Sequence, residues 1–185
     1  MALLPIITAP DPRLKRTAAP VEQVDAKIRR LLAEMLETMY AAPGIGLAGP
    51  QVGHPLRVVV VDVAEDDEKP APLKLVNPEI VEVTGPDAEY EEGCLSLPEY
   101  YAQVVRPNEV TVRYLDESGA AREIEAKAML ATCIQHEIDH LDGILFVDRV
   151  SAVRRNVILR KLIKAKKARD LPRFAELIAN VKAAV

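Results

Sequence analysis

The segment that most constrains this chain is Ala131–His140, which contains the pattern H-E-x-x-H at residues 136–140. Side chains four positions apart on an α-helix lie one above the other, so His136 and His140 can present both imidazoles to one metal ion. Glu137 lies about 100° around such a helix from His136, where it can exchange protons with a water at the metal. Apolar residues at helical spacing, followed by Gly143, predict that the helix ends near residue 142.

The motif alone does not specify a metal site, because two histidines and a glutamate can also form an ordinary polar helix face. An open catalytic site of the zinc type needs three protein ligands. Cys133 shares the histidine stripe, but it lies seven residues from His140, about 10 Å along the axis, which favours a small buried residue in the wall of the site. Cys94 follows Gly93 and would complete a His₂Cys set, although this segment taken alone favours a buried structural cysteine.

Composition predicts one ordinary globular domain. The chain has 185 residues, of which 49% are hydrophobic and 28% charged. No apolar run approaches the roughly 20 residues of a membrane span, and the N-terminus lacks the basic and apolar regions of a signal peptide. Two cysteines do not make a disulfide framework. These features predict a cytoplasmic protein without a membrane partner.

Charge is distributed unevenly. Residues 149–185 hold eleven Lys and Arg against two acidic residues, whereas the first 148 residues hold 13 basic and 26 acidic residues. This pattern predicts an acidic body with a basic helical tail, in which Ser151 caps one helix and Pro172 separates a second at about 172–183. By composition alone, the simplest role of such a tail is to keep the protein soluble.

The remaining pattern predicts an α+β fold. A helix is expected over residues 25–40 with Asp25 as N-cap, and a Gly/Pro-rich loop over 43–51. Strand-like runs of β-branched and apolar residues are found at 58–63, 73–76, 80–83, 102–105, 110–115 and 121–126. A hairpin turn is expected around 116–119. Because strands and helices do not alternate, we expect mainly antiparallel strands packed around a central metal-binding helix, with a C-terminal helix.

Three blocks of the sequence, taken together, resemble the peptide deformylase family. They are GIGLAGPQV at 44–52, EGCLSLP at 92–98 and QHEIDHLDG at 135–143, in the order and spacing of that family. The resemblance runs through residues 1–150 and implies a catalytic domain there, with 151–185 as a basic helical tail of the same domain. It implies a metallo-amidohydrolase that removes the formyl group from the N-terminal formyl-methionine of newly synthesised proteins and releases formate.

The resemblance also implies roles for individual residues. The metal ligands would be Cys94, His136 and His140, holding one Fe²⁺ per chain, for which Zn²⁺ or Ni²⁺ can substitute. A metal-bound water would attack the formyl carbonyl, with Glu137 as general base and then general acid. The side-chain amide of Gln51 and the backbone N–H of Leu95 would stabilise the oxyanion.

Substrate contacts follow from the same resemblance. An extended peptide would bind as an added strand along the backbone of Ile45, Gly46 and Gly93. The pocket for the methionine side chain would be formed by Met129, Thr132 and Cys133, with Ile45 and Glu92. The chain departs from the family at Thr132, which is more polar than expected, at Gly49, where Ala is usual, and at Glu99-Tyr100-Tyr101, where some relatives have an Arg.

Two alternatives remain at this stage: a zincin-like metallopeptidase and a non-catalytic ribosome-associated relative. The presence of every expected site residue argues against an inactive site. Some deformylases dock at the ribosome through the C-terminal helix, so the resemblance suggests that the basic tail binds ribosomal RNA phosphates.

Overall fold

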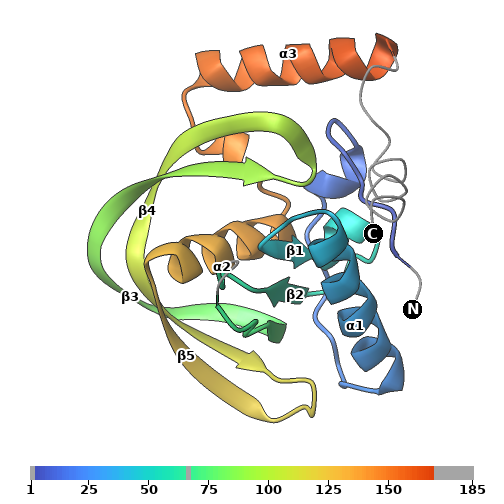
Figure 1. The fold of residues 1–185 in the computed structure, drawn as a ribbon, viewed down its shortest axis with the longest axis vertical. Coiled ribbons are helices and arrows are strands. Elements are labelled where there is room, and N and C mark those ends of the chain that lie inside the picture. Colours follow the sequence, from blue (N-terminus) through green and yellow to red (C-terminus); the bar gives the residue numbers. More distant parts are fainter. Residues whose placement is uncertain (1–2, 66–67, 169–185) are drawn as a thin grey trace.

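A computed structural model describes residues 3–65 and 68–168 of the chain. Five strands form one antiparallel sheet in the order β1-β2-β3-β4-β5 (Figure 1). The strands are β1 (Gly46–Ala48), β2 (Val58–Val61), β3 (Leu73–Cys94), β4 (Leu97–Leu115) and β5 (Ala121–Lys127). The helices are α1 (Ala26–Ala41), α2 (Ala128–Leu141) and α3 (Ala152–Ala168), with 3-10 helices η1 (Pro12–Lys15), η2 (Gly49–Val52) and η3 (Phe146–Asp148). The predicted α+β architecture is confirmed.

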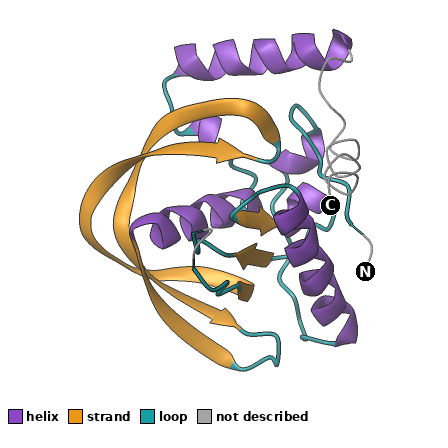
Figure 2. Cartoon of the chain, in the orientation of Figure 1, coloured by secondary structure: helices purple, strands orange, loops and turns teal. Residues whose placement is uncertain are grey.

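Strands β3 and β4 form one long, strongly bent hairpin that curves around α2 (Figure 2). The sequence predicted four short strands here, at 73–76, 80–83, 102–105 and 110–115. In the structure Pro78 and Pro86 lie where the register shifts, beside residues with positive φ, Asn77 (51°) and Gly85 (73°). Such irregularities let a strand bend without ending, since a proline at a bulge removes no ladder hydrogen bond.

Helix α2 lies at the centre of the molecule, and every residue from Ala131 to Leu141 is buried. Its apolar side packs on the sheet through Ile134, Ile138 and Leu141. The predicted end of the helix is confirmed, because Gly143 has φ +73° just beyond the last turn. A Cβ there would approach the backbone of Lys15 to 2.7 Å, so glycine is required for packing as well as for the turn.

Helix α1 and the turn between β4 and β5 also match the prediction. Asp25 accepts hydrogen bonds from the backbone N–H groups of Lys27 and Ile28, each at 2.9 Å, as an N-cap does. Asp116 likewise accepts from the backbone N–H groups of Ser118 and Ala120, which closes the hairpin turn. Helix α1 packs against β1 and β2 and thereby covers that end of the sheet.

Helix α3 buries only part of the apolar stripe that the sequence predicted. Ile158 and Leu162 are buried in a cluster with residues of β4 and η3, but Val153 and Val157, expected on the same stripe, are 76% and 47% exposed. Ser151 caps the helix as predicted, accepting from the backbone N–H of Arg154 at 3.4 Å. The expected second helix at 172–183 lies outside the described residues. None of the described helices is long and apolar enough to cross a lipid bilayer.

Candidate active site

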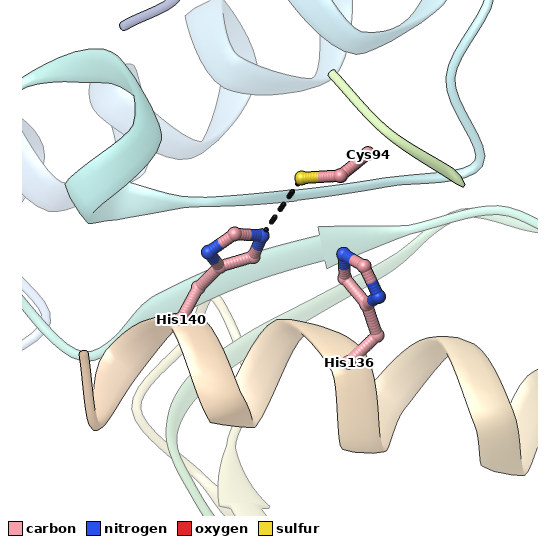
Figure 3. Close-up of side chains that lie close together, drawn as sticks. All are labelled: Cys94, His136 and His140. Atoms are coloured by element: carbon pink, nitrogen blue, oxygen red, sulfur yellow. Dashed lines mark hydrogen bonds between the residues drawn. The ribbon is translucent and has the colours of Figure 1, made fainter. Parts of the chain in front are cut away.

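Three potential ligands meet where the end of β3 lies over α2 (Figure 3). Sγ of Cys94 lies 3.1 Å from Nε2 of His140, and one donor atom from each of Cys94, His136 and His140 lies within 4.8 Å of the others. Ligands bound tetrahedrally at about 2.0–2.3 Å stand about 3.3–3.8 Å apart, so side-chain shifts of about 1 Å would let these groups share one ion. A thiolate and two imidazoles suit zinc and other first-row transition metals.

The ligand side chains are held by further hydrogen bonds. Nδ1 of His136 lies 2.8 Å from a carboxylate oxygen of Glu92, which leaves Nε2 available to an ion. The backbone N–H of Ser96 and the side-chain amide of Gln51 donate to Sγ of Cys94 at 3.4 and 3.6 Å. These two hydrogen bonds hold the sulfur beside His140.

The two histidines differ in their electrostatic surroundings. Burial, together with the charges of His136 and Arg106, lowers the pKa of His140 well below its usual value. Burial also opposes protonation of His136, but Cys94 and Glu92 outweigh it and raise the pKa of that imidazole. These two pKa shifts apply to the protein without a metal ion. A bound cation favours the neutral imidazole, because the metal and the proton compete for the same nitrogen.

Glu137 is a buried carboxyl group beside the ligands. Burial raises its pKa to about 7, the nearby negative charge of Glu92 adds to the shift, and His136 opposes it. Within the described part of the chain, one oxygen, Oε2, has no hydrogen-bond partner. A carboxyl group that gains and loses its proton near neutral pH can act as both base and acid.

Gln51 is fixed by η2, and this depends on Gly49. The Gln51 amide oxygen accepts from the backbone N–H of Ala48 at 2.7 Å, so its Nε2 points towards Ser96 and Cys94. A Cβ at position 49 would lie 2.7 Å from the carbonyl oxygens of His54 and Leu56. In this structure a side chain at position 49 would therefore require the backbone of His54 and Leu56 to shift.

A cavity of about 480 Å³ opens over these groups. Twelve of the thirteen predicted site residues line it, and only His140 lies behind the wall, 1% exposed. The lining residues among them are Ile45, Gly46, Gln51, Glu92, Gly93, Cys94, Leu95, Met129, Thr132, Cys133, His136 and Glu137. The cavity lies between the loop before β1, the end of the β3–β4 hairpin and α2.

The predicted pocket residues differ in how they meet the cavity. Cys133 is a buried wall residue whose thiol donates to the carbonyl of Ile45 at 3.4 Å, and burial raises the pKa of that thiol. Met129 is 41% exposed at the rim. The Thr132 hydroxyl is buried and has no hydrogen-bond partner among the described residues. Glu92 borders the cavity, but its carboxylate is bound to Arg106 and His136.

Sequence reasoning missed the ion pairs behind the ligands. Arg106 donates to Glu92 at 2.5 and 2.9 Å and to Asp139 at 2.8 Å, and Asp139 also binds Arg149. Arg106, Glu92 and Asp139 are 3%, 5% and 6% exposed. The sequence carried no clear signal, because Asp139 lies among polar helix residues such as His136, Glu137 and His140, and nothing around Arg106 distinguishes it from a surface arginine.

Comparisons with known proteins agree on one family. A sequence model of the family described as polypeptide deformylase matches residues 3–156. The chain is 52% identical over 167 residues to a peptide deformylase of Mesorhizobium japonicum, covering 90% of this chain and 95% of that protein. It is 50% identical over 169 residues to one of Rhizobium meliloti, covering 91% and 97%.

Solved structures give the same result for the fold. A crystal structure of peptide deformylase from Ehrlichia chaffeensis superposes with a TM-score of 0.86 at 39% identity, covering 92% of this chain and 100% of that one. The complex of an Ehrlichia chaffeensis peptide deformylase with actinonin gives 0.85 at 42% identity, covering 90% and 98%.

Proposed function

Because the chain belongs to the polypeptide deformylase family, we propose that it hydrolyses the N-formyl group of formyl-methionine at the start of newly synthesised proteins and releases formate. The family consists of metal-dependent hydrolases that act on formylated nascent peptides, so this chain is an enzyme. The observation that carries the proposal is a cavity in which Cys94, His136 and Glu137 meet the amide of Gln51.

Cys94, His136 and His140 would hold the ion, which we propose to be Fe²⁺, with Zn²⁺ or Ni²⁺ as functional substitutes. When bound, the ion supplies Lewis acidity, which makes water a nucleophile near neutral pH. The Cys94 thiolate contributes a negative charge that a third histidine would not, and this tunes the ion differently from a three-histidine site.

Glu137 moves the protons. Its carboxylate takes a proton from the attacking water, and the resulting acid gives that proton to the methionine nitrogen as the C–N bond breaks. The products are formate and a free N-terminal amine. The buried position of Glu137, one residue from His136, supports this role, because its raised pKa suits both steps.

The oxyanion formed during attack would be stabilised by Nε2 of Gln51 and the backbone N–H of Leu95. The hydrogen bond of Ala48 to the Gln51 amide oxygen orients the amide before substrate arrives. The contacts of Nε2 with Ser96 and Cys94, at 3.3 and 3.6 Å, are long, so the donor can turn to a developing negative charge.

The peptide would bind in an extended form. β1 is the last strand of the sheet on its side, and Gly46 lines the cavity next to Ile45, so a substrate strand can add along this edge. Gly93 would contact it from the opposite wall. The methionine side chain would lie among Met129, Thr132 and Cys133 on α2, with Met129 at the rim of the cavity and Thr132 and Cys133 buried in its wall.

Formate release from formyl-Met-Ala-Ser under anaerobic, iron-loaded conditions tests this function. We expect formate and free Met-Ala-Ser in equal amounts. A zincin-like peptidase would instead cleave an internal bond and release no formate, which would refute the proposal. N-acetyl-Met-Ala-Ser serves as the control substrate, because it lacks the formyl group and should not react.

We also propose that the basic segment after residue 150 contacts ribosomal RNA phosphates, and that residues 151–185 contribute nothing to the chemistry. Arg160, Lys161 and Lys164 of α3 are exposed, whereas Ile158 and Leu162 are buried in the core. Replacing these three basic residues by Gln is therefore a cleaner test than removing the helix. The triple variant should keep formate release and lose salt-sensitive co-sedimentation with ribosomes. Unchanged or salt-insensitive co-sedimentation would leave α3 as a solubilising helix.

A further inference from the structure

A chain of buried charges connects one predicted metal ligand to the surface of the protein. His136 contacts Glu92, Glu92 is bound by both Nε and Nη2 of Arg106, and Nη1 of Arg106 donates to Asp139. The same Asp139 carboxylate is bound by Nε and Nη2 of Arg149. Three elements contribute, with Glu92 on β3, Arg106 on β4 and Asp139 on α2, and Arg149 directly follows η3.

The charges in this chain balance only when Arg149 is included. Glu92 and Asp139 carry two negative charges, and Arg106, which lies between them, supplies one positive charge. Arg149 supplies the second, and it is the outermost member, with a side chain 40% exposed. Without it, two buried carboxylates would share one guanidinium. Leaving a buried charge uncompensated is costly, so the pairing would have to rearrange.

The geometry determines which contact changes. Asp139 takes hydrogen bonds from both arginines through the same oxygen, Oδ2, and Arg149 also occupies Oδ1. If Arg149 is removed, Asp139 has free acceptor capacity and draws Arg106 towards itself. Arg106 then holds Glu92 less firmly, and Glu92 is the group that fixes the ring of His136 through Nδ1.

We propose that Arg149 is a positioning residue for the metal site, acting on His136 through Asp139, Arg106 and Glu92. It touches neither the cavity nor the ligands. This inference rests on the proposed function only in that it requires Cys94, His136 and His140 to hold the ion. It predicts that a partly exposed side chain near the start of α3 sets how tightly the ion is held.

Arg155 provides a matched control. Its side chain is 39% exposed, close to the 40% of Arg149. It also forms an ion pair with a largely buried carboxylate, that of Asp148, which is 22% exposed. Asp148 is bound by Arg155 and Lys15 and by the backbone N–H of Leu145. No hydrogen bond in the described structure joins these residues to Glu92 or to a ligand, although the positive charge of Lys15 acts on His140. Arg149→Ala and Arg155→Ala therefore remove similar surface ion pairs, but only Arg149 is joined to His136 by a continuous series of side-chain hydrogen bonds. Asp148 lies in η3, whose Phe146 stacks on the His136 ring with 6.2 Å between ring centroids, so the control also measures any effect transmitted through η3.

The test measures the loss of Zn²⁺ from each loaded variant to an excess of chelator. We expect Arg149→Ala to release Zn²⁺ about three- to tenfold faster than the parent, below the 10–100-fold typical of a direct outer-shell partner. Arg155→Ala should match the parent, and Arg149→Lys should restore part of the loss. In steady-state assays kcat should fall for Arg149→Ala with little change in KM, because the peptide contacts are untouched.

A second readout does not depend on metal. The chain has three histidines, so the ring nitrogens of His136 can be resolved by ¹⁵N NMR of the metal-free protein. Their shifts should change in Arg149→Ala and stay unchanged in Arg155→Ala, which separates repositioning from a general loss of stability. Equal Zn²⁺ release by the two alanine variants, or unchanged His136 shifts in both, would overturn the inference. Formate release by the parent decides the proposed function independently.

Discussion

Gly46→Ala should damage catalysis through Glu137 while leaving the fold largely intact. An added Cβ would lie 2.5 Å from Oε1 of Glu137 and 2.8 Å from Sγ of Cys133, whereas ordinary contacts begin at 3.4 Å. The carboxylate would have to move by about 0.9 Å, the difference between 3.4 and 2.5 Å. A misplacement of about 1 Å in a catalytic group can cost roughly 10²-fold in rate.

The overlap is expected to cost about 1–3 kcal/mol of stability, as overpacking commonly does. The assay is kcat for formate release at saturating peptide, with the midpoint of thermal unfolding measured on the same samples. Gly44→Ala is the control, because it adds a methyl group in the same loop whose three nearest neighbours are all atoms of the Leu95 side chain, at 2.7–3.4 Å, and not of Glu137. The reasoning is refuted if Gly46→Ala keeps the parent kcat, or if Gly44→Ala loses as much.

Three further predictions follow from the site. Glu137→Ala should retain the ion but lose about 10²–10⁴-fold in kcat, and Gln51→Ala about 10²–10³-fold; near-normal turnover with normal metal content would remove either residue from its role. The Fe²⁺ form should lose activity in air faster than the Zn²⁺ or Ni²⁺ form, because an open thiolate-bound iron site exposes metal and sulfur to oxidation, and equal half-lives would contradict this. Burial alone would raise the pKa of Glu92, but hydrogen bonds from Arg106 and His136 lower it to about 2. Its ionised form therefore stabilises the fold fully above the ordinary value of 4.5, and this contribution is lost as pH falls towards 2. Acid unfolding followed by circular dichroism should thus depend less on pH over this interval in Glu92→Gln, and parallel curves would refute the assignment.

The residues that local pattern could identify were those whose geometry depends on a few neighbours along the chain. One turn of α2 brings together His136, Glu137 and His140. Asp25 is recognisable because its side chain caps the first turn of α1, and Gly143 because it adopts a left-handed conformation just after α2. Cys94 required the family resemblance, because it meets α2 only through the bend of the β3–β4 hairpin.

Features that depend on distant partners were not predicted. Arg106 and Asp139 are separated by 33 residues, and each reads in the sequence as a solvated charge until the fold buries them together. The continuity of β3 through Pro78 and Pro86 was missed for a related reason. A proline normally ends a strand, and only its cross-strand register reveals a bulge. Likewise, which half of the apolar residues on α3 would be buried depends on where the helix crosses the body.

The most direct test of the account is the metal content of Cys94→Ala and Cys133→Ala after loading and dialysis. Both substitutions remove a thiol that lines the same cavity, but only the Cys94 sulfur lies among the histidine nitrogens. Cys133→Ala should retain about one ion per chain, and Cys94→Ala should lose tight binding, because two imidazoles leave the site one ligand short. Equal retention by the two variants would contradict the assignment of Cys94, His136 and His140 as the metal site.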